Sequence, residues 1–280
     1  DNAIAVMGNV ASTTLPPSIK WGGNPGLQLS MFIRMLFSCL VDADSLDTEH
    51  YTDRATAELR GRTSDPKELL ARYERFMQFK FSNPDTDIKR ARAELLDECL
   101  SRAEGDRGLY SLTLPTGSGK TLISLGFALR HAVRHNMRRI VYVIPYTSII
   151  EQNAQVFREA VGTENVLEHH SNVQHDQDED WEEQTDEMRI QRKKLELAAD
   201  NWDYPVVVTT NVQFFESLFS NKRSRCRKLH NLANSVIVLD EAQMMNGEFF
   251  KPCLHVLEEL ARNYGSTVVL STATQPDVRP

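Results

Sequence analysis

The sequence predicts an α/β fold in which a parallel sheet is flanked by helices and is preceded by a region that is entirely helical. From Gly108 onward, short runs of β-branched and apolar residues alternate with longer stretches of helical spacing, which is typical of parallel sheets. These runs are apolar throughout, as in strands that are covered on both faces. The predicted strands are residues 109–114, 139–144, 206–210, 236–239 and 267–271.

The helical region begins after a loop-like stretch, residues 1–26, that is rich in Gly, Pro, Ser, Thr and Asn. Its first helix, residues 27–41, is apolar nearly all round, so we expect it to be buried. Residues 50–66 are polar and indicate a linker. The remaining predicted helices are residues 67–81, 86–103, 122–135, 147–160, 212–219 and 249–264.

The composition is that of an ordinary globular protein, with 280 residues, 41% hydrophobic, 25% charged and a net charge of -7. This charge indicates that any basic surface for nucleic acid must be local. Four scattered cysteines without a C-x-x-C pair argue against zinc and disulfides and favour a reducing cytoplasm. No apolar run approaches the roughly 20 residues of a membrane span. No signal peptide is recognised, and a start at Asp1 suggests a processed product or an excerpt.

A predicted strand end, a glycine turn and a helix start follow one another over residues 112–121, which is the layout of a phosphate-binding loop. The turn needs small residues so that backbone N–H groups can surround phosphate oxygens. Lys120 would face the β- and γ-phosphates, and the Thr121 hydroxyl would bind Mg²⁺. The first glycine of the usual pattern is Leu114 here, and the alternative is a glycine turn with a solvated lysine. The predicted ATP-binding residues are Thr116, Gly117, Ser118, Gly119, Lys120 and Thr121.

Two adjacent carboxylates, Asp240 and Glu241, follow the apolar run 236–239. In a nucleotide site, Asp240 would hold Mg²⁺ and Glu241 would polarise the attacking water, with Gln243 completing the predicted ATP-binding set. The alternative is a strand end capped by acids. Lys120 and Glu241 are therefore the predicted catalytic residues. Small residues after the last strand would couple this acidic pair to a moving neighbour; they are Ser271, Thr272, Ala273 and Thr274.

In this order, the three segments resemble motifs I, II and III of a superfamily 2 helicase. The sequence between them is similar to the CRISPR-associated helicase–nuclease of type I systems at residues 143–153, 168–171, 201–205, 208–216 and 272–276. The resemblance covers roughly residues 27–280. It implies the C-terminal part of an HD-type nuclease domain at 1–55, a linker helix region at 56–85 and a first RecA-like domain at 86–280.

The resemblance also implies a function, namely ATP-driven 3′→5′ translocation on single-stranded DNA with metal-dependent degradation of that strand. It implies ATP and Mg²⁺ as cofactors and, as a partner, the crRNA surveillance complex of type I systems (Cascade). DNA contacts would come from two segments after strands, whose hydroxyls, amide and helix N-terminal N–H groups suit phosphates. Tyr146 could also stack on a base. These residues are Pro145, Tyr146, Thr147, Ser148, Thr209, Thr210 and Asn211.

For the nuclease part, residues 40–47 resemble the helix whose alanine–aspartate pair supplies a metal ligand, which maps onto Asp44. The implied ion is a divalent transition metal (Fe, Mn, Co or Ni). The alternatives are that Asp44 caps the helix end, or that Asp42 is the ligand. The histidine-containing motifs of the family are missing before Asp44, and the second RecA-like domain is missing after motif III. We therefore expect a fragment that is weak or inactive by itself.

Two other functions stay open. One is a nucleotide- and DNA-binding module with little turnover, and the other is a superfamily 2 RNA helicase. The acidic stretch 174–187 indicates a solvated helix or loop, or else a partner-docking insertion. His169 and His170 are interpreted as hydrogen-bonded structural residues rather than ligands. We expect Lys120→Ala to abolish nucleotide affinity without affecting the fold, because an exposed loop lysine adds little to packing.

Overall fold

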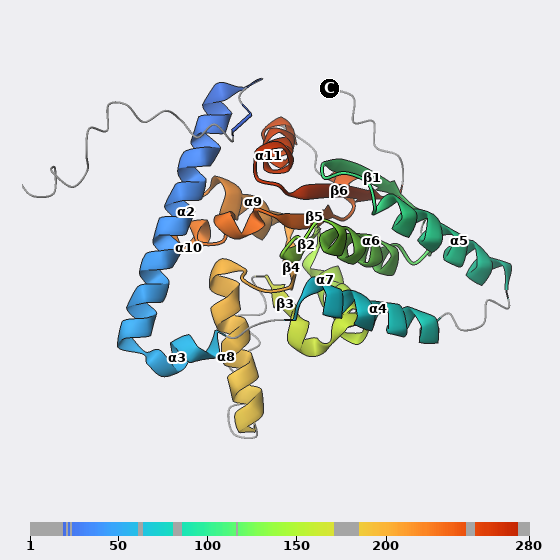
Figure 1. Cartoon of the computed structure of the whole chain (residues 1–280), viewed down its shortest axis with the longest axis horizontal. Helices are drawn as coiled ribbons and strands as arrows, with labels where there is room; N and C mark the ends of the chain where they lie inside the picture. The colour runs from blue at the N-terminus through green and yellow to red at the C-terminus, as the bar shows by residue number, and fades with distance from the viewer. Residues whose placement is uncertain are drawn as a thin grey trace, which may run out of the picture.

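A six-stranded parallel sheet forms the centre of the protein (Figure 1). The computed structural model describes residues 19–20, 22, 24–60, 64–80, 86–115, 117–170, 185–244 and 250–273. The strand order is β1-β6-β5-β2-β4-β3. The strands are β1 (Leu109–Thr113), β2 (Arg139–Ile144), β3 (Val166–His169), β4 (Val206–Thr210), β5 (Ser235–Leu239) and β6 (Thr267–Thr272).

Five of these strands lie where the sequence predicts them, and β3 is an addition. The edge strand β3 has only four residues, and two of them are Glu168 and His169. A run this short and half polar lacks the apolar signal of a buried strand. The α/β fold expected from the alternation of strands and helices is confirmed.

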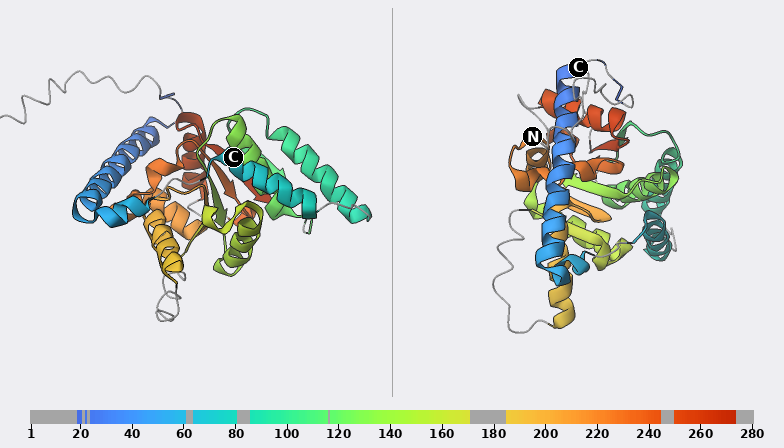
Figure 2. Two further views of the ribbon diagram at one scale, coloured as in Figure 1. Left: turned by 60° about the horizontal axis from the view of Figure 1, so that its bottom comes forward. Right: turned by 60° about the vertical axis from the view of Figure 1, so that its left-hand side comes forward.

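Helices cover both faces of the sheet (Figure 2). One core joins the sheet to α4 (Pro66–Lys80), α5 (Asp87–Arg102), α6 (Lys120–Arg134) and α7 (Thr147–Val161). The opposite core joins it to α2 (Pro25–Thr52), α8 (Asp186–Asn201), α9 (Asn211–Phe219), the 3-10 helix η3 (Leu229–Leu232) and α11 (Phe250–Asn263). Because successive strand side chains alternate between faces, Tyr142 enters the first core while Val141 and Val143 enter the second.

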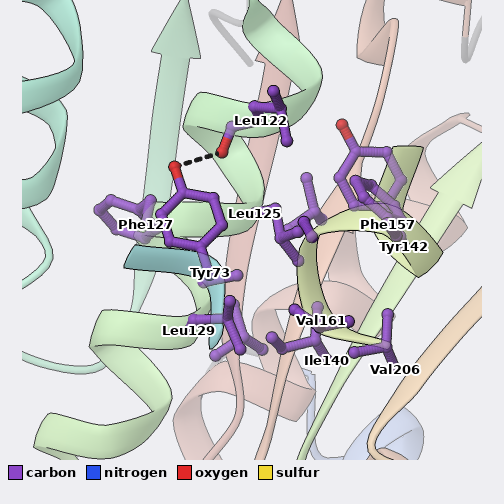
Figure 3. Close-up of a cluster of buried hydrophobic side chains, with 14 of the residues drawn as sticks. Tyr73, Leu122, Leu125, Phe127, Leu129, Ile140, Tyr142, Phe157, Val161 and Val206 are labelled. Atoms are coloured by element: carbon purple, nitrogen blue, oxygen red, sulfur yellow. Dashed lines mark hydrogen bonds between the residues drawn. The ribbon is translucent and has the colours of Figure 1, made fainter. Parts of the chain in front are cut away.

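Helix α4 is held against α6 by Tyr73, which is almost completely buried (Figure 3). Its hydroxyl donates a hydrogen bond of 2.9 Å to the backbone oxygen of Leu122. The ring lies over Gly126, where an added Cβ would overlap the hydroxyl oxygen and ring carbons of Tyr73. The missing side chain at Gly126 therefore lets the two helices approach closely, directly behind the predicted phosphate loop.

The expectation that the first helix is buried all round is wrong, because α2 has one covered and one exposed face. Its inner face carries Met31, Met35 and Ser38 against the domain, and Arg34 donates a 2.8 Å bond to the backbone oxygen of Leu218. The outer face is apolar but exposed. We call it the α2 stripe; it consists of Leu29, Ile33, Leu36, Phe37 and Leu40, with exposed fractions of 41% to 67%.

By length and composition, α2 would be able to cross a membrane. The sequence does not predict this, because it contains no uninterrupted apolar run of about 20 residues. One such helix is weak evidence, since a helix packed on a protein core passes the same test. About a third of its most apolar window is buried inside the protein. The predicted linker 50–66 also differs from expectation, since it contains the short helix α3 (Arg54–Leu59).

Gly126→Ala should lower the free energy of unfolding, although alanine is the better helix former by up to about 1 kcal/mol. The added methyl group would overlap the Tyr73 ring, and overpacking of this kind costs about 1–3 kcal/mol. Urea denaturation would measure the change. Tyr73→Ala combined with Gly126→Ala is the control, because the alanine should do no further harm once the ring is gone. A gain in stability in Gly126→Ala alone would contradict this packing.

Candidate nucleotide site and nucleic-acid interface

The predicted phosphate loop joins β1 to the N-terminus of α6. Gly117 and Gly119 adopt φ values of +79° and +89°, a region in which only glycine is unstrained. A Cβ at either residue would project into space that no described atom fills within 4 Å. The α6 N-cap, Gly119, has no side chain, so no side-chain cap takes up the first N–H groups of the helix. The loop thus has the open, positive N-terminal cradle that a phosphate requires.

Lys120 extends from this cradle to the acidic pair at the end of β5. Its ammonium lies 2.8 Å from Oδ1 of Asp240 and also hydrogen-bonds Glu241. Gln243, on the 3-10 helix η4 (Ala242–Met244), donates a 2.5 Å bond to Oε2 of Glu241. Glu241 itself has a φ of 48°, in the left-handed region that is costly for a residue with a side chain. The loop lysine and both predicted acids therefore form one cluster.

The charges in this cluster stabilise one another. Burial alone would lower the pKa of Lys120, but its hydrogen bonds to Asp240 and Glu241 outweigh burial and raise the pKa. Burial likewise opposes ionisation of Glu241, yet bonds from Lys120 and Gln243 lower its pKa. The expectation of an exposed Lys120 is wrong, because its side chain is only 15% exposed. The lysine balances the buried carboxylate of Asp240.

Several buried hydroxyls around the cluster have no hydrogen-bond partner among the described residues: Ser118 Oγ, Ser271 Oγ and Thr272 Oγ1. Ser118 belongs to the phosphate loop, and the other two end β6, which lies between β1 and β5 in the sheet. Buried hydroxyls usually have partners, so these atoms suit incoming polar ligands. With the Thr121 hydroxyl and the Asp240 carboxylate as oxygen donors, the residues present fit a nucleotide with Mg²⁺.

Two contacts to this site were not predicted from the sequence. Arg92, on α5, donates hydrogen bonds of 3.0 Å and 2.5 Å to the backbone oxygen of Gly117. Asn153, on α7, accepts a 3.3 Å bond from the Thr121 hydroxyl. No local signal marks Arg92, whereas Asn153 falls inside the segment 143–153 that carries the family resemblance. Next to the loop, α4, α5 and α6 enclose a hollow of about 460 Å³, of a size for a small ligand.

The two predicted DNA-contact segments lie side by side at the carboxyl edge of the sheet. The strands β2 and β4 are paired, with Ile144 opposite Thr210. Residues 145–148 therefore follow β2 beside the end of β4, where Thr209 and Thr210 still belong to the strand and Asn211 begins α9. Tyr146 is the N-cap of α7 and is 48% exposed, while Thr210 caps α9 by accepting a 3.0 Å bond from the Gln213 amide. Asn211 Oδ1 is buried and has no hydrogen-bond partner among the described residues. The structure thus brings the predicted residues together; their contact with DNA stays a prediction.

Asp42 and Asp44 occupy different environments on α2. The buried carboxylate of Asp42 binds Arg227 at 2.9 Å and Asn201 at 3.0 Å, which fixes the C-terminal half of the helix to the domain. Asp44 has a side chain that is 60% exposed, and it forms an ion pair with Arg223. The assignment of Asp44 as a metal ligand stays a prediction, but Asp42 is already engaged in protein contacts.

His169, the last residue of β3, and His170, which follows it, are engaged in hydrogen bonds, as expected. His169 Nδ1 accepts a 3.1 Å bond from the Trp202 indole, and burial, with the nearby Lys228 charge, lowers its pKa to about 3. His170 Nε2 lies 2.8 Å from Glu168 Oε1.

Three predictions fall outside the described residues: Thr116 of the phosphate loop, Thr274 of the coupling segment, and 174–184 of the acidic stretch.

Comparison with known proteins shows to which class of protein this chain belongs. Residues 89–279 match the profile of DEAD/DEAH box helicases, which is well over half of the chain. The chain therefore belongs to the DEAD/DEAH box helicase family, and its sheet is the RecA-like sheet expected from the sequence.

The particular resemblance is to the CRISPR-associated nuclease/helicase Cas3 of Haloferax volcanii, which is 32% identical over 203 residues. The match covers 67% of this chain and 22% of that protein, so the chain spans about a fifth of its curated relative. Among solved structures, T. fusca Cas3 with ADP matches with a TM-score of 0.49 and 22% identity, over 65% of this chain and 20% of that one. The Pyrococcus furiosus Hef helicase domain matches with a TM-score of 0.44 and 18% identity, over 65% and 33%.

Lys120→Ala should abolish nucleotide binding and, contrary to the sequence-based expectation, should also destabilise the ligand-free protein. Removal of the ammonium leaves Asp240 buried beside Glu241 without a counter-ion, which costs about 2 kcal/mol. Chemical denaturation without nucleotide would measure the loss, and a fluorescent ATP analogue would measure binding.

The matched control is the double variant Lys120→Ala with Asp240→Asn. Neutralising the buried acid should restore most of the stability but no nucleotide binding. Equal stability of Lys120→Ala and the wild type would show that the ion pair contributes nothing, and retained nucleotide affinity would refute the site.

Proposed function

We propose that this chain binds and hydrolyses ATP, and that hydrolysis drives movement along single-stranded DNA. The single observation that carries the proposal is the cluster of Lys120, Asp240 and Glu241 below an open glycine cradle. The residues that we predict to contact DNA lie on the same carboxyl edge of the sheet. Membership of the DEAD/DEAH box helicase family supports the reaction class. The full protein's direction of movement, 3′→5′, is part of the proposal.

The site residues divide the chemistry among them. When nucleotide enters the cradle, the Lys120 ammonium would exchange its carboxylate partners for the β- and γ-phosphate oxygens. The Thr121 hydroxyl and Asp240 would hold Mg²⁺, which supplies positive charge to the phosphates. Glu241, released from Lys120, would orient a water molecule and accept its proton as the water attacks the γ-phosphorus. Ser271, Thr272 and Ala273 lie beside both elements and would link this change to a neighbouring domain.

For the whole protein, we propose a DNA nuclease fused to this motor. Residues 1–55 would form the C-terminal part of the nuclease domain, residues 56–85 a linker helix region, and residues 86–280 the first RecA-like motor domain. The α2 stripe supports this, because Ile33, Phe37, Leu40 and Asp44 follow one another at helical spacing on one face. A transition metal held by Asp44 would then lie at the end of an apolar face that needs a cover. The curated relative is a CRISPR-associated nuclease/helicase, which supports a cytoplasmic role beside a type I surveillance complex (Cascade).

Glu241→Gln should bind ATP but hydrolyse it at least about a hundredfold more slowly, because the amide cannot accept the proton. Single-turnover formation of ADP would measure this, with single-stranded DNA, RNA of the same sequence, or no nucleic acid added. We expect stimulation by DNA. No hydrolysis in the wild type would favour a passive binding module, and stimulation by RNA alone would favour an RNA helicase.

Asp44→Ala, made in the full-length protein, should abolish metal-dependent degradation of single-stranded DNA and leave DNA-stimulated ATP hydrolysis intact. The prediction follows from the position of Asp44 outside the nucleotide site, on α2. Nuclease and ATPase assays on the same preparation would separate the two activities. The matched control is Asp47→Ala, an exposed aspartate on the same helix. Normal DNA degradation by Asp44→Ala would remove Asp44 from the proposed metal site.

A further inference from the structure

A groove runs along the carboxyl end of β3, between α8 on one side and α9 with the short helix α10 (Arg223–Cys226) on the other. We call it the α8–α10 groove. It has a volume of about 920 Å³ and is distinct from the nucleotide site. The residues that matter here are Arg158, Glu168, Arg192, Gln213, Ser224 and Lys228.

Lys228 is the unusual residue of this groove. It is only 7% exposed, yet no carboxylate among the described residues lies within 4 Å of its ammonium. The contacts that it makes are weak: a 3.4 Å hydrogen bond to the Ser224 backbone oxygen and a position 6.0 Å from the centre of the Trp202 ring. Burial lowers its pKa to about 8, so most of the population is still charged at pH 7. A buried cation of this kind is stabilised by an anion.

The other charges of the groove are already paired. Arg158 binds Glu168 at 2.8 Å, Arg192 lies 3.5 Å from Glu196, and Asp200 is shared by Arg60 and Arg227. Arg225 binds Glu216 at 2.8 Å. Asp200 also attracts Lys228, but Arg60 and Arg227 already share that carboxylate. Among the described residues of the groove, Lys228 is therefore the cation without an ion pair of its own.

The groove adjoins the residues that are predicted to contact DNA. Its wall includes Gln213, in the first turn of α9, and this helix begins directly after Thr210 at the end of β4. Asn211 Oδ1, which has no hydrogen-bond partner in the described part of the chain, lies at the same helix start. Apolar side chains, Met188 and Leu195 of α8, form part of the opposite wall. Alternating phosphates and bases of a single strand match a groove with a buried cation and an apolar wall.

We propose that the α8–α10 groove binds single-stranded DNA, in addition to the predicted DNA contacts at the ends of β2 and β4. Lys228 would hold one phosphate of the DNA backbone. The inference rests on the proposed function and adds to it a second stretch of the DNA path. The contact is to the backbone, so it is independent of base sequence.

The test is the affinity of the full chain for a fluorescent oligothymidylate, measured by anisotropy at several salt concentrations. Lys228→Gln should weaken binding about tenfold and reduce the magnitude of the salt slope by about 1, as expected for one lost phosphate contact. Lys228→Arg, which keeps the charge, should retain most of the wild-type affinity for DNA. ATP-analogue binding, measured on the same samples, should stay unchanged in both variants.

A second variant avoids the buried position in case Lys228→Gln fails to fold. Ser224→Glu places a carboxylate at the exposed rim of the groove and should also weaken DNA binding, whereas Ser101→Glu, exposed on α5, should not. If wild type binds DNA and neither groove variant changes affinity or salt slope, the groove proposal is wrong and the proposed function stands. If the wild type binds ATP but no DNA, both are wrong.

Discussion

The parallel alignment of six strands is the constraint on which the rest of this structure depends. Parallel strands begin at one edge of a sheet and end at the other, so segments that follow different strands meet at one edge. The phosphate loop follows β1, the acidic pair follows β5, and the small hydroxyl residues end β6 between them. Lys120 and Asp240 are 120 positions apart in sequence, and their side chains are 2.8 Å apart. The same edge carries the residues after β2 and β4.

Much of the fold and of the nucleotide site could be predicted because their signals are local. Apolar strand runs, a glycine turn and two acids after a strand each report on a few neighbouring residues. The contact of Arg92 with Gly117 could not be predicted, because it joins two elements whose docking depends on the packing of α5 against α6. The burial of Lys120 was missed for the same reason. An exposed lysine and a lysine that neutralises a distant aspartate have the same sequence signal.

Helix α2 shows a different limit of sequence reasoning. An all-apolar helix predicts two covered faces, but the sequence does not say what covers them. The domain covers the face of Met31 and Met35, and buried polar residues, Ser38 and Asp42, fix the helix by specific hydrogen bonds. Such contacts specify one docking arrangement, whereas apolar contacts tolerate several. The α2 stripe is therefore the region where the described structure departs from what its sequence leads one to expect.

The two faces of α2 have a mechanical consequence. The helix is continuous over 28 residues, which corresponds to a rod of about 42 Å. One side of this rod is anchored to the domain at Arg34, Ser38 and Asp42, spread over two turns. A domain that packed on the other side would be joined to the sheet by this one continuous helix, without a flexible linker at that junction. A movement of the sheet would then move that domain by the same amount.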